Sequence, residues 1–167
     1  MSSPDGTAPA SNGEGIAAAL GRIPSGLFVV TWRDGPTDRA MLASWVMQAG
    51  FVPPRLALAI GPGRDLLAAL DAGAAVVVNI LAESQRSLLS RFGKPIGPGE
   101  DPFAGLAVSR SPEGGVVLDS SGGWLECRLA TRTAGGDHVV AVVDVIGGGA
   151  GPEPQPLVHL RKNGLRY

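Results

Sequence analysis

Residues 37–60 constrain the fold more than any other part of the chain. They read TDRAMLASWVMQAGFVPPRLALAI, which indicates a strand, a crossing built on small residues, and a second strand. Pro53-Pro54 closes the crossing and forces an extended entry into the run from Leu56 to Ile60. An extended backbone with small side chains such as Ala43 and Ala49 leaves room for a flat or charged group against the main chain, or else forms a tightly packed bulge.

Strands dominate the rest of the pattern. A β-rich run from Leu27 to Trp32 is followed by the turn signal Asp34-Gly35-Pro36 and then by a strand over 40–46, which predicts a hairpin. Further strands are predicted over 75–81, 123–133, 137–148 and 157–161, and helices near 16–20, 64–70 and 84–92. Helices inserted between hairpin-connected strands favour a small, mainly β barrel with a few peripheral α-helices over an alternating βαβ sheet.

Composition excludes several classes of protein. The net charge is −1, which argues against binding nucleic acid through phosphate neutralisation. Cys127 is the single cysteine, so an intrachain disulfide is impossible, and its spacing from His138 and His159 is not that of a metal site. No apolar run is long enough to span a membrane, and no secretory signal is present, so we expect a cytoplasmic protein.

The domain organisation expected from the sequence is simple. Residues 1–14 are small and polar, typical of a disordered N-terminal leader, and residues 15–167 form one domain. Gly61-Pro62-Gly63 lacks the third glycine of a dinucleotide fingerprint, which argues against a Rossmann fold.

Six segments in register resemble the flavin reductase-like family, and most closely the C-terminal flavin reductase-like module of cyanobacterial diflavin flavoproteins. They are AALGRIPSGLFVVT (17–31), AMLASWVMQAGF (40–51), VVVNIL (76–81), RF…DPFAGL (91–106), GWLECRL (123–129) and GDHVVAVVDV (136–145). The resemblance implies an FMN-binding split β-barrel with Greek-key-like connections. It also implies a homodimer with FMN as cofactor (FAD being possible) and NADH or NADPH as hydride donor.

The resemblance implies a set of site residues as well. The family places the flavin along the stretch equivalent to residues 44–49, where Ser44 and Gln48 offer polar contacts, Trp45 an aromatic wall, and Val46 and Ala49 the intervening backbone. Many members carry Asn-Ser where this chain has Ser44-Trp45, so the detailed contacts differ from the commonest pattern.

Three residues outside that stretch are further candidates, each with a structural alternative. Arg64 is suited to clamp a phosphate, or is a solvated arginine at a helix start. Asn79 lies in an apolar run, where an amide needs a partner, and either touches the cofactor region or caps the following loop. In the family, the histidine equivalent to His138 lies near the flavin or nicotinamide, where it is a candidate catalytic residue; alternatively, Asp137 fixes a turn and orients His138.

The function implied by the resemblance is that of an NAD(P)H-dependent flavin reductase that passes hydride to flavin N5. Two alternatives are an FMN-bound electron-transfer module that feeds a partner flavoprotein or oxygenase, and a flavin-binding protein without reductase activity. Trp45 keeps the last alternative open, because its indole could fill the space that a nicotinamide needs.

Overall fold

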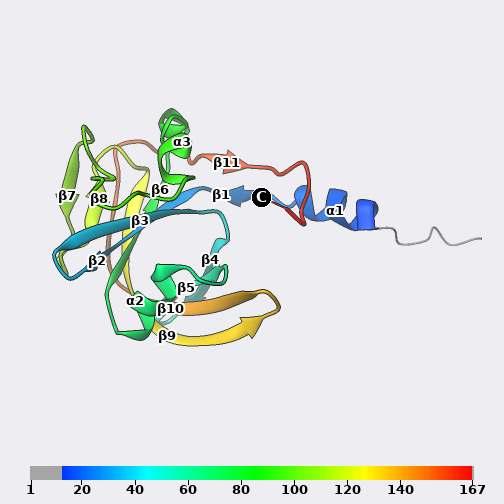
Figure 1. The fold of residues 1–167 in the computed structure, drawn as a ribbon, viewed down its shortest axis with the longest axis horizontal. Coiled ribbons are helices and arrows are strands. Elements are labelled where there is room, and N and C mark those ends of the chain that lie inside the picture. Colours follow the sequence, from blue (N-terminus) through cyan, green and yellow to red (C-terminus); the bar gives the residue numbers. More distant parts are fainter. Residues whose placement is uncertain (1–12, 167) are drawn as a thin grey trace, which may run out of the picture. The chain divides into compact units, whose positions relative to one another are not determined.

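The central feature of the structure, a computed structural model that describes residues 13–166, is a seven-stranded antiparallel sheet (Figure 1). Its strands lie in the order β3-β2-β6-β9-β10-β5-β4. They are β2 (Phe28–Asp34), β3 (Thr37–Ala43), β4 (Val46–Phe51), β5 (Pro54–Ile60), β6 (Val76–Ile80), β9 (Gly123–Gly135) and β10 (His138–Ala150).

The sheet curves into a barrel that is split between its two edge strands. These edges, β3 and β4, are consecutive in the chain, so the chain passes from one edge to the other through Ser44 and Trp45 alone. The N–H of Ala59 on β5 donates to the carbonyl oxygen of Trp45 at 3.0 Å, which anchors the crossing to the β4 side. The split-barrel fold implied by the resemblance is confirmed.

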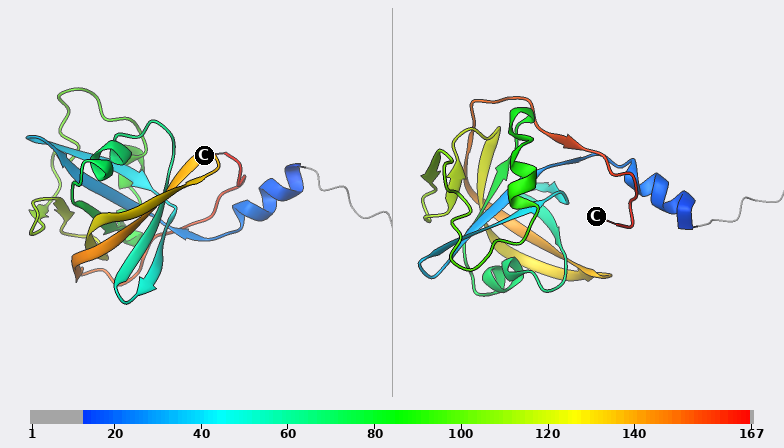
Figure 2. Two further views of the ribbon diagram at one scale, coloured as in Figure 1. Left: turned by 90° about the horizontal axis from the view of Figure 1, so that it is seen from below. Right: turned by 45° about the horizontal axis from the view of Figure 1, so that its top comes forward.

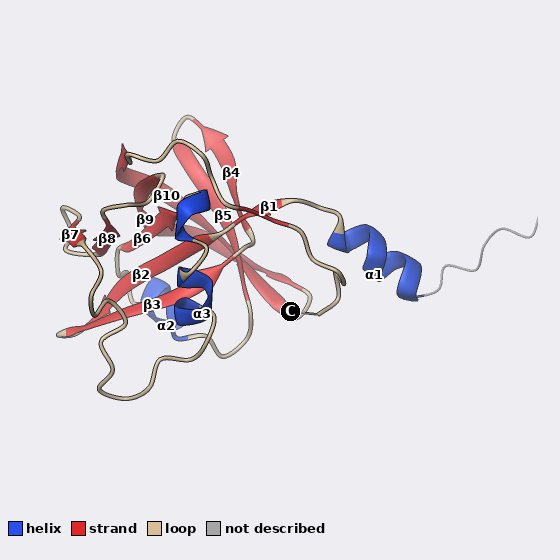
Figure 3. Cartoon of the chain, turned by 90° about the horizontal axis from the view of Figure 1, so that it is seen from above, coloured by secondary structure: helices blue, strands red, loops and turns tan. Residues whose placement is uncertain are grey.

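Alternation along the strands creates two hydrophobic layers. Phe28, Val30 and Trp32 of β2 belong to the core inside the barrel, which also receives Leu66 and Leu70 of α2 (Asp65–Asp71). The opposite face of the sheet packs on α3 (Leu88–Phe92) and on a small hairpin of β7 (Val108–Arg110) and β8 (Val116–Leu118). Figure 3 shows α2 and α3 outside the strands.

The longest hairpin joins β9 and β10 (Figure 2). Its register shifts twice, between Val142 and Val143 and between Val145 and Gly147, and such shifts increase the local bend of a sheet. β9 pairs with β6 and β10 pairs with β5, so the hairpin lies in the middle of the seven-stranded sheet.

The chain divides into two compact units, of which residues 25–158 form the barrel. In the other unit, α1 (Gly13–Gly21) packs against the last segment of the chain, since the N–H groups of Arg161 and Gly164 donate to the carbonyls of Gly21 and Ala17. The remaining short elements are β1 (Ser25–Gly26), which pairs with β11 (Val158–His159), and the 3-10 helix η1 (Glu83–Gln85).

Most predicted elements are present, with some differences. The strand predicted over 40–46 ends at Ala43, and most of the segment predicted as a non-strand crossing forms a strand, β4. The helix predicted over 84–92 is interrupted, with η1 preceding α3, and the last strand covers only Val158 and His159. Most of the predicted leader, residues 1–12, lies outside the described residues, whereas Gly13 and Glu14 begin α1.

Candidate functional site

The crossing between the barrel edges directs neighbouring side chains to different places. Val46 pairs with Leu58 and packs on the core inside the barrel. Trp45, the residue before it, packs instead on a histidine from β10, as described below. A short segment therefore contributes to two adjoining features, a pocket and an aromatic pair.

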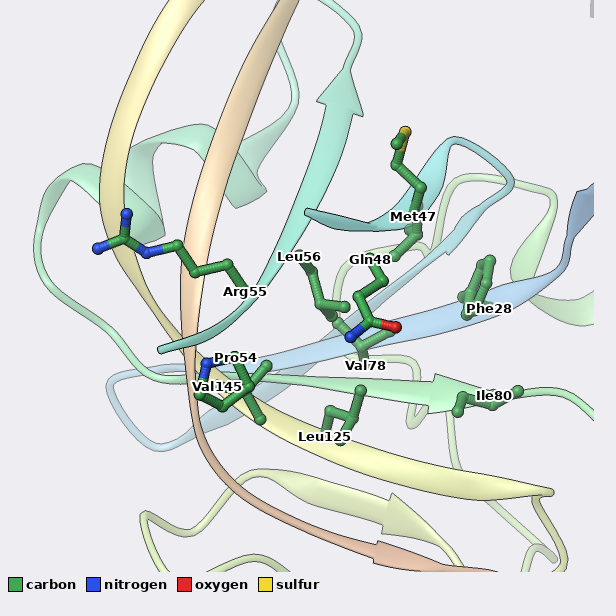
Figure 4. Close-up of a pocket in the computed structure, with 11 residues that line it drawn as sticks. Phe28, Met47, Gln48, Pro54, Arg55, Leu56, Val78, Ile80, Leu125 and Val145 are labelled. Atoms are coloured by element: carbon green, nitrogen blue, oxygen red, sulfur yellow. The ribbon is translucent and has the colours of Figure 1, made fainter. Parts of the chain in front are cut away.

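The pocket has a volume of about 310 Å³ and lies on the inner face of the sheet beside the split (Figure 4). Its walls are almost wholly apolar, and its polar side chains are Gln48 and Arg55. Arg55 forms an ion pair with Asp144 through Nε and Oδ1 at 2.7 Å. The lining residues come from β2, β4, β5, β6, β9 and β10: Phe28, Val46, Met47, Gln48, Pro54, Arg55, Leu56, Val78, Ile80, Leu125 and Val145.

The aromatic pair consists of Trp45 and His138, which are 93 positions apart in the chain. Their ring centroids are 4.7 Å apart and the rings are tilted by 52°. His138 is the first residue of β10, is buried, and shares a hydrogen bond of 2.9 Å between Nδ1 and Oδ1 of Asp137. This hydrogen bond is the main reason why the pKa of Asp137 lies below its ordinary value.

Gly61 leaves space beside the imidazole of His138. A Cβ atom at this position would lie 3.6 Å from Nε2, which is an ordinary van der Waals contact. Arg64, three residues further on, stands at the N-cap of α2, is exposed, and forms no ion pair with any of the residues 13–166. It is not among the pocket-lining residues.

Two other residues of the crossing are accessible to a ligand. Ser44 is half-buried in the split, and its hydroxyl makes no hydrogen bond within the described part of the chain. Ala49 is exposed at a register shift between Gln48 and Gly50, where the regular pairing of β4 with β5 is interrupted.

Residues 20–164 match the family described as flavin reductase like domain. The chain belongs to the flavin reductase like domain family. The predicted family, its flavin cofactor and its oxidoreductase class are thereby confirmed.

Curated relatives of this flavin reductase like domain are much longer proteins. It is 37% identical over 161 residues to putative diflavin flavoprotein A 6 of Nostoc sp. and 38% identical over 165 residues to putative diflavin flavoprotein A 3 of Synechocystis sp.. These alignments cover 95% and 98% of the chain but only 28% of each relative.

Solved structures share its fold. A homologue of nitrilotriacetate monooxygenase component B from Mycobacterium thermoresistibile superposes with a TM-score of 0.79 at 26% identity, covering 87% of this chain and 80% of that one. An NADH:FAD oxidoreductase from Streptomyces globisporus superposes with a TM-score of 0.77 at 24% identity, covering 89% and 87%.

Asn79 of this flavin reductase like domain makes hydrogen bonds within the fold and does not line the pocket. It lies on the outer face of β6, opposite Val78 and Ile80, which line the pocket. Its amide nitrogen donates to the carbonyls of Val29 and Val116, and its oxygen accepts from the N–H of Leu118. The fully buried side chain is thus satisfied by backbone groups and joins β8 to the barrel wall.

Sequence reasoning did not find most of the pocket. Phe28, Leu125 and Val145 come from three strands distant in sequence, and nothing in their local pattern separates a pocket wall from a packed core.

No helix of the described residues is long and apolar enough to cross a membrane. Within residues 13–166, no three histidine, cysteine, aspartate or glutamate side chains are grouped so as to hold a metal ion.

Proposed function

We propose that this flavin reductase like domain binds FMN along residues 44–49 and reduces it with NADH or NADPH. The observation that carries the proposal is that Val46, Met47 and Gln48, from the stretch that the family resemblance assigns to the flavin, line the apolar pocket. The NAD and FAD fragments bound in one structure of the Streptomyces oxidoreductase further support this pair of ligand classes.

The pocket suits one part of FMN. A volume of about 310 Å³ is at the lower end of the range for small-molecule sites, about 300–1,000 Å³. The apolar walls match the dimethylbenzene side of the isoalloxazine ring, and the Gln48 amide supplies a donor and an acceptor near the ring. The ribityl phosphate would then extend beyond the pocket, and Ser44 and Arg64 are the polar and cationic side chains that would hold it.

When bound, the flavin supplies the redox chemistry by accepting a hydride from the nicotinamide at N5. The residues of the chain bind and orient. Trp45 and His138 form an aromatic wall on the other side of the crossing, and the tilted packing of their rings restricts both side chains. Apolar residues such as Val46 and Leu125 exclude water from the ring.

We further propose that the working unit is a homodimer. The β4–β5 hairpin exposes Met47, Phe51 and Val52, with 66%, 84% and 96% of their surface accessible. An edge strand that exposes large apolar side chains is prone to pairing with another chain unless it is covered, and a second copy would cover it.

A second candidate function is an electron-transfer module that keeps its FMN and reduces a partner flavoprotein. The observation in its favour is that the matched relatives, named diflavin flavoproteins, contain this domain as about 28% of their length. Such a module would hold FMN tightly and would reduce added free flavin slowly.

The test begins with the absorption spectrum of the purified chain with and without added FMN, followed by anaerobic addition of NADH or NADPH. Bleaching of the flavin band, with multiple turnovers of free FMN, is the expected result. Bleaching limited to one equivalent of bound FMN would favour the module, and no bleaching with either donor would contradict the reductase.

A pocket-filling variant links the activity to the site. Gln48→Trp, at an exposed position on the pocket rim, is expected to weaken FMN binding at least about tenfold, because the indole would occupy space needed by the ring. Thr133→Trp, at an exposed position of β9 away from the pocket, is the matched control. Equal FMN affinity of the two variants would show that the flavin binds somewhere other than this pocket.

A further inference from the structure

Phe28 forms part of the pocket wall at the end that lacks a charged side chain. Figure 4 shows Phe28 and Ile80 at one end of the pocket and Arg55 at the other, with the Gln48 amide between them. Phe28 on β2 and Ile80 on β6 are direct partners in the sheet. On its other side Phe28 pairs with Ala43, the last residue before the crossing that we assign to the flavin. The pocket therefore has one apolar end, which adjoins the crossing, and one end with a cation.

Gly26 of β1, two residues before Phe28, determines where the phenyl ring can lie. A Cβ atom at this position would be 2.6 Å from Cζ, 2.9 Å from Cε2 and 3.5 Å from Cε1 of the ring. The two shorter distances are well below the optimal separation of two carbon atoms, about 3.5–4.0 Å, so the ring could not keep its position beside an alanine. Since the three nearest atoms all belong to Phe28, the missing side chain at Gly26 makes room for this ring.

The difference between the two ends of the pocket matches the difference between the two edges of a flavin. The dimethylbenzene edge of the isoalloxazine ring is apolar, whereas the pyrimidine edge carries hydrogen-bonding groups. Buried polar groups without partners are costly, so the apolar end of the pocket favours the dimethylbenzene edge. A flavin bound in this orientation would direct its methyl groups toward Phe28.

We propose that Phe28, held in place by the space at Gly26, is a specificity-determining residue that limits the size of the substituents accepted on the benzene edge of the flavin. This inference rests on the proposed function. Phe28 contacts the flavin itself, whereas Gly26 is a positioning residue that acts through the phenyl ring. A flavin with a group larger than methyl at position 8 is selected against, because an overfilled apolar site forces its side chains out of their preferred positions.

The position of the ring is tested without cofactor, by urea unfolding of the unaltered chain, Gly26→Ala, Phe28→Leu and the double variant. Leucine has no Cζ or Cε atoms, so Phe28→Leu removes the three atoms nearest to a Cβ at position 26 and keeps an apolar side chain. We expect Gly26→Ala alone to lower the urea midpoint. In the Phe28→Leu background the same change should leave the midpoint unchanged or raise it, because alanine restricts the unfolded chain more than glycine does. A midpoint lowered equally in both backgrounds would overturn the role of Gly26.

Titration with FMN and with its 8-dimethylamino analogue tests the specificity. The analogue carries a larger group at the edge of the flavin that we direct toward Phe28. We expect the affinity for the analogue relative to FMN to rise about tenfold in Phe28→Leu, which is the lower end of the usual effect of one carbon group in an apolar pocket. An unchanged ratio, with both ligands bound, would overturn the specificity role.

The matched control is Val145→Ala, which shortens a wall residue that lies near Pro54 and away from Phe28 (Figure 4). This variant should weaken the binding of both ligands alike and keep the ratio of their affinities. An equal rise of the ratio in Val145→Ala and Phe28→Leu would overturn the proposal, since the selectivity would then belong to the pocket as a whole.

FMN titration of the Gly26→Ala variants separates a displaced ring from a general effect on the fold. We expect Gly26→Ala to weaken FMN binding in the unaltered background and not in the Phe28→Leu background. Equal weakening in both backgrounds would overturn the positioning role. If neither FMN nor its analogue binds to the unaltered chain, the proposed function fails and the specificity role with it, while the urea midpoints still decide whether Gly26 positions the ring.

Discussion

At the scale of single residues, His138 is the side chain whose removal should separate binding from catalysis. His138→Leu removes both ring nitrogens, and with them every side-chain hydrogen bond at this position, but leaves the pocket walls in place, since His138 does not line the pocket. Loss of one hydrogen bond to a neutral group costs about 1.4 kcal/mol, so we expect the rate of flavin reduction by NADH to fall about tenfold in anaerobic stopped-flow experiments. FMN affinity should change little.

The control for this substitution is His159→Leu, which alters the other histidine of the chain in the same way and should keep the original rate. An unchanged rate in His138→Leu, with FMN bound normally, would show that His138 is not a catalytic residue.

The residue scale also shows where sequence reasoning reached its limit. The family resemblance proposed Trp45 and His138 independently, and the structure brings their rings together. It could not decide between two roles for Asn79, because that depends on which face of β6 the side chain occupies and on the carbonyls of Val29 and Val116. Apart from residues of the 44–49 stretch, such as Val46 and Gln48, the pocket walls were not predicted, because they are assembled from six strands.

At the scale of secondary-structure elements, an ion pair connects the edge strand β3 to the β7–β8 hairpin. Arg110 donates from Nη1 and Nη2 to the two carboxylate oxygens of Asp38, each at 2.7 Å, and Arg33 lies 3.8 Å from the same carboxylate. The hydrogen bond from Arg110 is the main reason why the pKa of Asp38 is lowered. The Arg110 side chain is half exposed, so solvent screening limits its contribution.

We expect Asp38→Asn to lower the free energy of unfolding by about 1 kcal/mol or less at pH 7. A lowered carboxyl pKa stabilises the folded state above the ordinary value of 3.8, and this stabilisation is lost as the pH falls through the lower folded-state pKa. Urea unfolding of the two proteins should therefore differ at pH 7 and converge as the pH falls below 3.8. A difference that stays constant down to the lowest pH would show that the charge of Asp38 is not its cause.

The glycine-rich end of β10 permits a close approach of two backbones. A Cβ atom at Gly151 would overlap the carbonyl oxygen of Ser121, whereas one at Gly147 would lie 3.6 Å from the nearest atom, Oε2 of Glu126. Gly151→Ala should lower the free energy of unfolding by about 1–3 kcal/mol, the usual cost of overpacking, and Gly147→Ala by much less. Urea titrations of both variants measure the difference, and equal stability would contradict the close approach.

At the scale of the whole molecule, the parts of the barrel that could be predicted are the hairpins, because their two paired strands are neighbours in the sequence. The turn signal at Asp34-Gly35-Pro36 correctly predicted the β2–β3 hairpin, and the neighbouring strands predicted over 123–133 and 137–148 pair as the β9–β10 hairpin. Residues 46–51 were harder to predict. Their small side chains indicate a non-strand segment, but they are also compatible with an exposed edge strand, which is what β4 is. The position of the split follows from the order of strands in the sheet, because β3 and β4, which are consecutive in the chain, are its two edge strands.

The split also bears on assembly, since β4 is an edge strand whose hairpin exposes Phe51 and Val52. If a second copy covers this hairpin, Phe51→Asp should convert the dimer into a monomer, because a charge would be buried in an apolar interface without a partner. Light scattering coupled to gel filtration measures the mass, and Thr133→Asp, at an exposed position of β9, should leave the dimer intact. A monomeric unaltered chain would exclude the dimer, and a dimer that survives Phe51→Asp would show that the interface lies on another face.

Measuring FMN affinity on the same samples then shows whether assembly and FMN binding are coupled. We expect coupling because Met47 is both exposed on the hairpin and part of the pocket wall.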